Sequence, residues 1–262
     1  MPVDLKGRSI IVTGAGRGIG EAIARGLVAD GAKLVIADID EKSARTVATS
    51  INAGGGQAIG LSVDVARRDS VQAMVKATIA AFGRLDVIFN NAGIAQTRPF
   101  LSITEEDWHR VMNVNGLGVL ICMQEAAKQM IAQGGGGKIV NTASIAGKQG
   151  YEPLAHYCAS KFGVVALTQA AARAFGVHKI NVNAICPGVV ATEMWKVIDR
   201  GFKDEGLTTR DNEAFENFSS TILLGRPSKA EDLVGVSRFL ASSDSDYMTG
   251  QSLVVDGGMV LV

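Results

Sequence analysis

The 262-residue sequence contains little cysteine, little proline and few aromatic residues. It has three Cys, five Pro and 5% Phe, Trp and Tyr. Cys122, Cys158 and Cys186 are too few and too far apart for a disulfide scaffold, and no Cys-x-x-Cys or His/Cys pair stands at zinc spacing. We therefore expect three buried thiols, a reducing, cytoplasmic environment and no metal site.

An excess of charge of one sign and a long hydrophobic run are also absent. Lys+Arg and Asp+Glu are 26 each, so no basic surface for a phosphate backbone is expected. The uncharged stretch that most resembles a membrane span, residues 111–124, is shorter than the ~18 apolar residues that a span needs and contains two Asn. The first twenty residues contain several charged side chains and only a brief apolar run, so they do not resemble a signal peptide. We expect a soluble protein without a nucleic-acid or membrane partner.

Glycine, in contrast, is abundant, with 31 residues that follow no collagen-like period. The length fits one large α/β domain or two small ones, and no low-complexity linker divides the chain. We therefore expect residues 1–262 to form a single domain in which glycine serves particular backbone positions.

Short β-branched runs alternate with longer segments of helical period. The expected strands are 9–13, 33–37, 58–63, 85–89, 138–142, 180–185 and 252–255, and the expected helices are 19–29, 41–52, 70–82, 105–132, 156–175 and 229–240. Strands that are apolar on both faces and separated by helices form a parallel sheet covered on both sides. The sequence thus predicts an α/β fold, a single-domain, Rossmann-type, doubly wound parallel sheet of about seven strands with helices on both faces.

One charged and irregular insertion, residues 193–224, separates the sixth expected strand from the last expected helix. A long connection at the carboxyl edge of a strand is either a functional lid or an incidental insertion. Because ligands of open α/β sheets bind outside those strand ends, we favour a substrate lid.

A glycine-rich segment, residues 13–20, lies between the first expected strand and the first expected helix. A side chain in so tight a turn blocks a pyrophosphate from the backbone N–H groups and the positive helix end, so Gly14, Gly18 and Gly20 suit a phosphate loop. The spacing is Gly-x3-Gly-x-Gly rather than Gly-x-Gly-x-x-Gly. The alternative is an ordinary strand-to-helix turn.

Asp38 ends the second expected strand, where a carboxylate accepts hydrogen bonds from ribose hydroxyls and repels a 2′-phosphate. This favours NAD over NADP. Arg17 could pair with such a phosphate, which keeps NADP as the alternative, and Asp38 could also be a helix N-terminal acid. Asp64, after the third expected strand, either bonds the adenine amine or caps the next helix.

Proton-transfer chemistry is predicted at Ser144, Tyr157 and Lys161. Tyr157 and Lys161 are four residues apart on an expected helix and project from one face. The ammonium favours the phenolate, so we expect it to lower the pKa of Tyr157 toward neutrality. Ser144 ends the fifth expected strand, where its hydroxyl can hold a carbonyl or carbinol oxygen. Tyr-x3-Lys alone is also typical of a surface pair.

With these three residues and the glycine loop, the sequence resembles the short-chain dehydrogenase/reductase family over essentially its whole length. Residues 90–93, residues 114–116 and the segment of Pro187, Gly188 and Thr192 match further family motifs in order and without a gap. The resemblance implies that Tyr157 is the general acid/base, that Lys161 lowers its pKa and binds the nicotinamide ribose, and that Ser144 donates to the substrate oxygen.

The resemblance also implies a relay residue and a set of cofactor contacts. Asn115 resembles the residue whose helix irregularity holds a water in a proton relay; the alternative is a satisfied polar group inside a helix. Thr192 resembles a carboxamide contact; the alternative is a helix N-cap. The implied cofactor contacts are Gly14, Arg17, Gly18, Ile19, Gly20, Asp38, Asp64, Val65, Asn91, Ala92, Gly93, Tyr157, Lys161, Pro187, Gly188, Val190 and Thr192.

The substrate side is predicted to be aromatic and nearly uncharged. Tyr151 and Trp195 suit a small neutral secondary alcohol beside Ser144 and Tyr157, although Trp195 could simply pack the lid. Residues 192–200 and 244–259 resemble acetoin reductases and 2,3-butanediol dehydrogenases, whereas residues 157–159 and 184–190 resemble sorbitol-type dehydrogenases. Ile145 stands where many acetoin reductases carry Gln. We expect an NAD-dependent oxidoreductase of small polyols or vicinal diols and their ketones.

Two other functions stay open at this point. A 3-oxoacyl thioester reductase that uses NADPH shares every motif, although Asp38 and the neutral charge disfavour it. A non-catalytic dinucleotide sensor needs only the glycine loop, so the Ser144, Tyr157, Lys161 and Asn115 set disfavours that. The family also implies a homotetramer through two long helices and the C-terminal strand; the alternative is that the apolar tail packs within its own subunit.

Overall fold

The computed structural model describes residues 4–261 and contains one parallel seven-stranded sheet in the order β3-β2-β1-β4-β5-β6-β7. The strands are β1 (Ser9–Thr13), β2 (Lys33–Asp38), β3 (Gln57–Ser62), β4 (Val87–Asn90), β5 (Gly137–Thr142), β6 (Ile180–Pro187) and β7 (Ser252–Val255). The chain order reverses between β1 and β4, which pair Ile10 with Val87. This confirms the predicted Rossmann-type fold, because such a reversal opens a crevice for ligands at the carboxyl edge.

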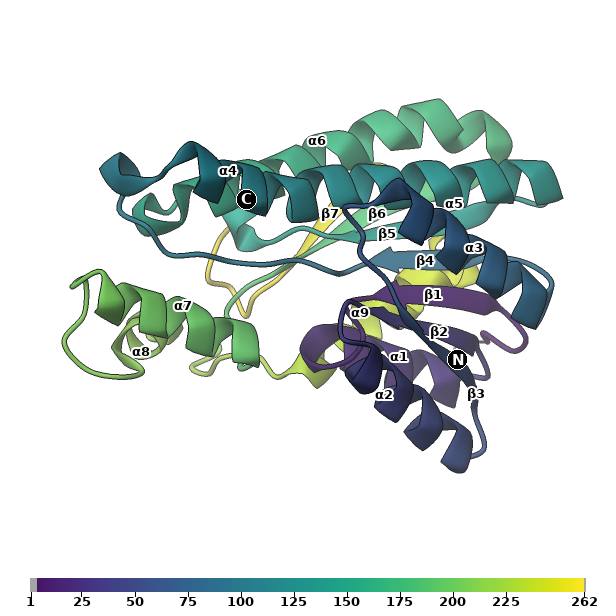
Figure 1. Cartoon of the computed structure of the whole chain (residues 1–262), viewed down its shortest axis with the longest axis horizontal. Helices are drawn as coiled ribbons and strands as arrows, with labels where there is room; N and C mark the ends of the chain where they lie inside the picture. The colour runs from purple at the N-terminus through teal and green to yellow at the C-terminus, as the bar shows by residue number, and fades with distance from the viewer. Residues whose placement is uncertain (1–3, 262) are drawn as a thin grey trace.

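Helices cover both faces of the sheet (Figure 1). The helices are α1 (Gly18–Ala29), α2 (Glu41–Ala53), α3 (Arg68–Phe82), α4 (Glu105–Met112), α5 (Val119–Gln133), α6 (Ala155–Phe175), α7 (Glu193–Asp204), α8 (Glu213–Ser219) and α9 (Val234–Ala241). Helices α3, α5 and α6 pack on one face, and α1, α2 and α9 on the other. None of the helices in residues 4–261 has the length and apolarity that a membrane crossing requires.

The sequence explains why the central strands are buried and the helix ends are defined. All residues of β1 and β4 are buried, as expected of strands covered on both sides. Helix α4 begins with a capping box in which Thr104 and Asp107 each bond the other's backbone N–H. Helix α3 ends at Gly83, which adopts φ +82°, a left-handed conformation that favours glycine.

Two expectations about secondary structure are wrong. The expected helix 105–132 is divided by a π-helical turn, Asn113–Gly118, which separates α4 from α5. The insertion 193–224 is not irregular: it contains α7 and α8. Charged residues obscured the helical spacing of the apolar residues in this insertion. Lys196 pairs with Glu193 on α7, and Arg210, just before α8, pairs with Glu216 of α8.

The insertion, which stays a predicted substrate lid and is called the lid below, packs on the body through its own small core. Ile198 and Phe202 of α7 and Ala214 of α8 are buried against Tyr157 and Leu154. In Figure 1 the lid lies beyond the carboxyl edge of the sheet, opposite α4. The carboxyl ends of the strands therefore lie between the body of the sheet and the lid.

Candidate active site

The glycine-rich loop follows β1 and ends in the first turn of α1, as predicted. Gly14 and Gly18 have φ of +62° and +59°. A Cβ on Gly14 would stand 2.8 Å from Ala92 Cα, and one on Gly20 would collide with the Gly14 carbonyl. The loop therefore needs glycine for both conformation and close approach, and it leaves the N-terminus of α1 open to an anion.

The segment after β4 holds this loop in place. The side-chain amide of Asn91 donates to the carbonyls of Thr13 (3.0 Å) and Gly14 (3.2 Å). The backbone N–H groups of Asn91 and Ala92 both donate to Thr13 Oγ1, at 3.0 and 3.1 Å. Asn91 and Ala92 thus join the two strands between which the chain order reverses.

Asp38 lies at the end of β2 and faces the glycine loop. Its carboxylate accepts from the N–H of Gly16 (2.9 Å) and of Asp40 (3.1 Å). The alternative role, a helix N-terminal acid, belongs instead to Asp40, which caps α2 by accepting from Lys42 and Ser43. The carboxylate of Asp38 is half-buried and therefore partly exposed to solvent beside the loop.

Three further predicted cofactor residues surround that position. Arg17 is the exposed residue before α1 and makes no side-chain cap, and Ile19 lies in the first turn of α1. Hydrogen bonds from Ser43 lower the pKa of Asp40, and the charge of Arg17 adds to that shift. Asp64 accepts from the N–H of Ala66 (3.0 Å) and does not cap α3, whose N-cap is Arg67.

Ser144, Tyr157 and Lys161 come together at the carboxyl ends of β5 and β6, as the sequence predicts. All three are buried, with 9%, 8% and 4% of their surface exposed. The Lys161 ammonium donates to the carbonyl of Thr142 at 2.8 Å and lies 5.7 Å from the centroid of the Tyr157 ring. The Ser144 hydroxyl accepts from the N–H of Ala146 at 3.1 Å, which fixes its direction.

The pKa of Tyr157 differs from the expectation. Burial raises the pKa of Tyr157 to about 12, and a hydrogen bond with Ser144 opposes this rise. Burial also lowers the pKa of Lys161 to about 8. The expected lowering is not found, because burial disfavours the phenolate and the Lys161 ammonium donates to Thr142.

Asn115 lies in the π-helical turn, where the family resemblance implied an irregularity. Its side-chain oxygen accepts from the N–H of Ile94 (2.9 Å), and its amide donates to the Ile94 carbonyl (2.9 Å) and to Ser160 Oγ (3.1 Å). Both alternatives hold in part: the helix is irregular there, and the side chain is fully satisfied. Asn115 fixes the strand-to-helix segment after β4 onto α6.

Gly93 joins the two halves of the site. A Cβ on Gly93 would stand 3.2 Å from Asn115 Oδ1 and 3.6 Å from Lys161 Nζ. Val65 is buried against the π-helical turn, 2.8 Å from where a Cβ on Gly118 would stand. Lys161 and Asn115 therefore both border Gly93 in the segment after β4.

The segment after β6 completes the cofactor side. Pro187 is the last residue of β6, and Gly188 approaches Asp256 so closely that a Cβ there would stand 2.5 Å from Asp256 Cβ. Thr192 holds the N-cap position of α7 but donates to the Val190 carbonyl (3.3 Å) and makes no cap bond. A Cβ on Gly18 would lie 3.7 Å from Thr192 Cγ2, so the lid begins beside the phosphate loop.

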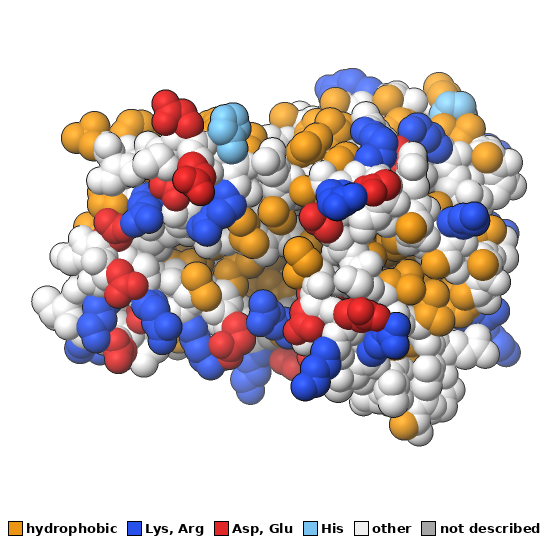
Figure 2. Space-filling view, in the orientation of Figure 1, with side chains coloured by type: hydrophobic (Ala, Val, Ile, Leu, Met, Phe, Trp, Pro, Cys, Tyr) orange, Lys and Arg blue, Asp and Glu red, His pale blue; other side chains and the backbone are white. Residues whose placement is uncertain are grey.

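An aromatic wall, formed by lid residues together with Tyr151 of the body, packs in one cluster with Tyr157. The rings of Tyr151 and Trp195 pack on Phe218 at 5.6 and 5.3 Å, and Trp195 also meets Phe215 at 5.7 Å. In Figure 2 this face is hollowed between the lid and the helices above it, with hydrophobic side chains on the floor. The Tyr151 hydroxyl is buried without a partner in the described chain.

Sequence reasoning missed the contribution of Phe202, Phe215 and Phe218 to this wall. The i, i+3 spacing of Phe215 and Phe218 is the signal that could have found it, since both then project from one face of α8. Within residues 4–261 no three His, Cys, Asp or Glu side chains are grouped to hold a metal ion.

Comparison with known proteins places this site in a family. A family model described as enoyl-(acyl carrier protein) reductase matches residues 14–260. A diacetyl reductase, (S)-acetoin forming, from Staphylococcus epidermidis is 42% identical over 97% of this chain and 98% of its own length. A galactitol 2-dehydrogenase from Agrobacterium fabrum is 42% identical over the same shares. The crystal structure of a gluconate 5-dehydrogenase from Burkholderia cenocepacia, in complex with NADP and tartrate, superposes with a TM-score of 0.88 at 36% identity, covering 98% of this chain and 96% of that one.

The relatives are named as dehydrogenases and reductases, which shows that the chain is an oxidoreductase. The chain belongs to the short-chain dehydrogenase/reductase family. Its relatives of known activity are dehydrogenases and reductases, which disfavours the non-catalytic sensor.

Proposed function

We propose that this protein transfers a hydride between NAD and the secondary alcohol or ketone carbon of a small polyol or vicinal diol. The observation that carries the proposal is the joint burial of Ser144, Tyr157 and Lys161 beside the glycine loop. Relatives named for diacetyl, acetoin and galactitol support this substrate class.

The chain's own residues would manage the proton and the substrate oxygen. A bound nicotinamide would accept or supply the hydride at the carbinol carbon. Tyr157 would give its phenolic proton to the oxygen of a ketone during reduction and take it back during oxidation. Ser144 would hold that oxygen, and Lys161 with Asn115 would support the proton path behind the phenol.

The glycine loop and Asp38 fit a dinucleotide with a free ribose 2′-hydroxyl. The half-buried carboxylate of Asp38 beside Gly16 would accept hydrogen bonds from the ribose hydroxyls and would repel a 2′-phosphate. The exposed Arg17 and the NADP in the gluconate 5-dehydrogenase complex are what favour NADP. We propose NAD because the carboxylate is fixed by the loop, whereas the arginine side chain is not.

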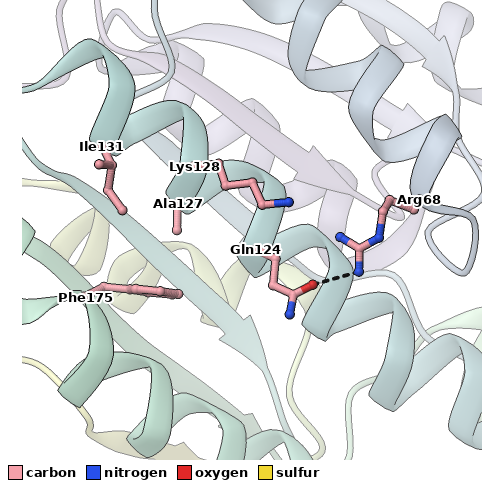
Figure 3. Close-up of a pocket in the computed structure, with 6 residues that line it drawn as sticks. All are labelled: Arg68, Gln124, Ala127, Lys128, Ile131 and Phe175. Atoms are coloured by element: carbon pink, nitrogen blue, oxygen red, sulfur yellow. Dashed lines mark hydrogen bonds between the residues drawn. The ribbon is translucent and has the colours of Figure 1, made fainter.

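We also propose a homotetramer, formed through α5, α6 and β7. Leu117, Ile131 and Phe162 on this helical face are 43%, 41% and 45% exposed, and β7 is an edge strand. A groove of about 330 Å³ lies on the same face (Figure 3), where Ala127, Ile131 and Phe175 form an apolar floor. It is not the active site, because Phe175 lies 18 residues along α6 from Tyr157, about 27 Å at 1.5 Å per residue.

The compartment proposed is the cytoplasm. Cys122, Cys158 and Cys186 are all buried free thiols, which suits a reducing environment.

An absorbance assay at 340 nm tests the proposal. Purified protein is mixed with NADH or NADPH and with acetoin, fructose or an acetoacetyl thioester, and its mass is measured by light scattering. We expect oxidation of NADH by acetoin or fructose, and the mass of four chains. Turnover restricted to NADPH and the thioester would instead support the 3-oxoacyl thioester reductase.

A further inference from the structure

We propose that Thr97 and Gly201 form the seat of the lid and position its aromatic wall against Tyr157. The proposal rests on the proposed function, since it assigns what the seat does during substrate binding. Thr97 lies in the segment between β4 and α4, and Gly201 lies in the third turn of α7. Neither is part of the predicted catalytic or cofactor set.

The contact between the two is unusually close. Thr97 is 5% exposed, and its hydroxyl donates to the Ile198 carbonyl of α7 at 3.1 Å. A Cβ added to Gly201 would stand 2.7 Å from Thr97 Cβ and 2.8 Å from Thr97 Oγ1. The threonine side chain therefore fills the notch that glycine leaves on the surface of α7.

On the body side, the segment that carries Thr97 is fixed. The N–H of Arg98 donates to the Pro153 carbonyl at 2.8 Å, four residues before Tyr157. Earlier in the same segment, Ile94 exchanges two hydrogen bonds with Asn115. Thr97 is thus held by the same elements that hold the catalytic phenol.

On the lid side, α7 and α8 form one unit. The buried carboxylate of Asp199 accepts from the N–H of Asn212 (2.6 Å) and of Phe215 (3.1 Å), at the start of α8. Phe218 of α8 packs on both Trp195 and Phe202 of α7. The depth at which α7 sits on Thr97 therefore sets the position of all these rings together.

The two ends of the lid are anchored elsewhere. At the start, the N–H of Ala191 donates to the Ser228 carbonyl at 2.9 Å; at the end, the N–H of Leu224 donates to the Gly257 carbonyl at 3.1 Å. A larger side chain at the contact between Thr97 and Gly201 would consequently tilt the middle of the lid away from Tyr157 and leave its ends in place. Thr97 and Gly201 are positioning residues and do not touch the reacting atoms.

Gly201→Ala tests the seat. Alanine favours a helix more than glycine does, so α7 itself is not weakened. Misplacing bound groups by ~1 Å can cost ~100-fold in rate, so we expect kcat/KM for the carbonyl substrate to fall roughly 10- to 100-fold, mainly through KM. The Kd of NADH, measured by fluorescence, should stay within about twofold, because the cofactor loop is untouched.

Exchanging the sizes of the two side chains, with Thr97→Gly and Gly201→Ala together, tests whether the change in KM comes from this contact. Thr97→Gly removes the two atoms that the alanine would meet, leaving Thr97 Cα at 3.7 Å. In the Thr97→Gly background, adding Gly201→Ala should therefore change KM by less than about twofold, the non-additivity that marks direct contact. Gly235→Ala on α9, where a Cβ meets nothing within 4 Å, is the matched control and should leave KM unchanged.

A readout that does not depend on activity separates this proposal from the proposed function. In a Trp108→Phe background, Trp195 is the only tryptophan. Gly201→Ala should increase quenching of Trp195 by acrylamide, and Thr97→Gly/Gly201→Ala should match Thr97→Gly alone. Equal quenching in Gly201→Ala and its parent, or an alanine effect that persists in the Thr97→Gly background, would overturn the seat. If the parent turns over no tested carbonyl while quenching follows the size exchange, the seat stands and the proposed function fails.

Discussion

The two walls of the active-site cleft are built in opposite ways. On the sheet side, Asn91, Asn115 and Lys161 each bond a backbone carbonyl of a neighbouring segment, so the wall is fixed by the fold itself. On the lid side, packed rings and the hydrogen bonds of Asp199 hold α7 and α8 to each other, and Thr97 and Arg98 make the lid's polar contacts with the segment after β4.

This difference separates chemistry from substrate choice. Groups that move a proton must be preorganised, and burial on rigid strand ends supplies that. A substrate pocket needs shape more than charge, and the aromatic wall supplies shape on an element that can move as a unit. We therefore expect changes on the sheet side to alter kcat or cofactor use, and changes on the lid side to alter KM.

Tyr157→Phe is expected to have the largest effect. It removes the proton donor and keeps the ring, so kcat should fall by about 10²- to 10⁴-fold while the Kd of NADH stays nearly unchanged. Steady-state kinetics and fluorescence titration measure the two quantities. Tyr151→Phe, the other phenol of the cleft, is the matched control and should lose far less. Retained turnover in Tyr157→Phe would refute the assigned role.

Asp38→Asn should change cofactor preference without changing chemistry. Hydrogen bonds to charged groups contribute more than neutral ones, so we expect the ratio of kcat/KM for NADH over NADPH to fall by roughly 10- to 100-fold. Asp40→Asn is the control, since Asp40 caps α2 and accepts no hydrogen bond from the loop backbone. An unchanged ratio in Asp38→Asn would show that Arg17 or another group decides the cofactor.

The two walls differ in how well the sequence predicts them, because one depends on local residue spacing and the other on contacts between residues far apart in the chain. The glycine loop, Asp38 and the Tyr157–Lys161 helix depend on local spacing, and the structure places them where spacing predicts. The seat at Thr97 and Gly201 joins residues 104 positions apart, so no local pattern reveals it.

The raised pKa of Tyr157 was out of reach for a related reason. It depends mainly on the burial of the phenol, which a four-residue spacing does not set, and the direction of the Lys161 ammonium toward Thr142 is not set by that spacing either. Helix α8 was missed because Asp199 caps it from another helix, a signal that is absent from the sequence around residue 213.

The same pKa shifts predict different pH profiles for the two directions. With the pKa of Tyr157 raised to about 12, the phenol carries its proton at neutral pH, so kcat/KM for ketone reduction should be flat from pH 6 to about 7. Around pH 8 Lys161 loses its charge, because its pKa is lowered to about 8, and reduction should decline. Alcohol oxidation needs the phenolate and should rise by up to about tenfold per pH unit. A reduction rate that falls between pH 6 and about 7 would contradict this order.

The smallest effect is expected at the exposed ion pair beside the seat. Arg98 pairs with Glu205 at the end of α7 and lies 3.5 Å from Asp107 of α4, and its side chain is 41% exposed. Exposed pairs contribute little, so Arg98→Gln should raise KM by only about twofold, and the difference should vanish in 1 M salt, where the screening length is ~3 Å. Arg210→Gln breaks a pair within the lid and should leave KM unchanged. A tenfold, salt-sensitive loss in Arg98→Gln would mean that charge, rather than the fit of Thr97 against Gly201, holds the lid to the sheet edge.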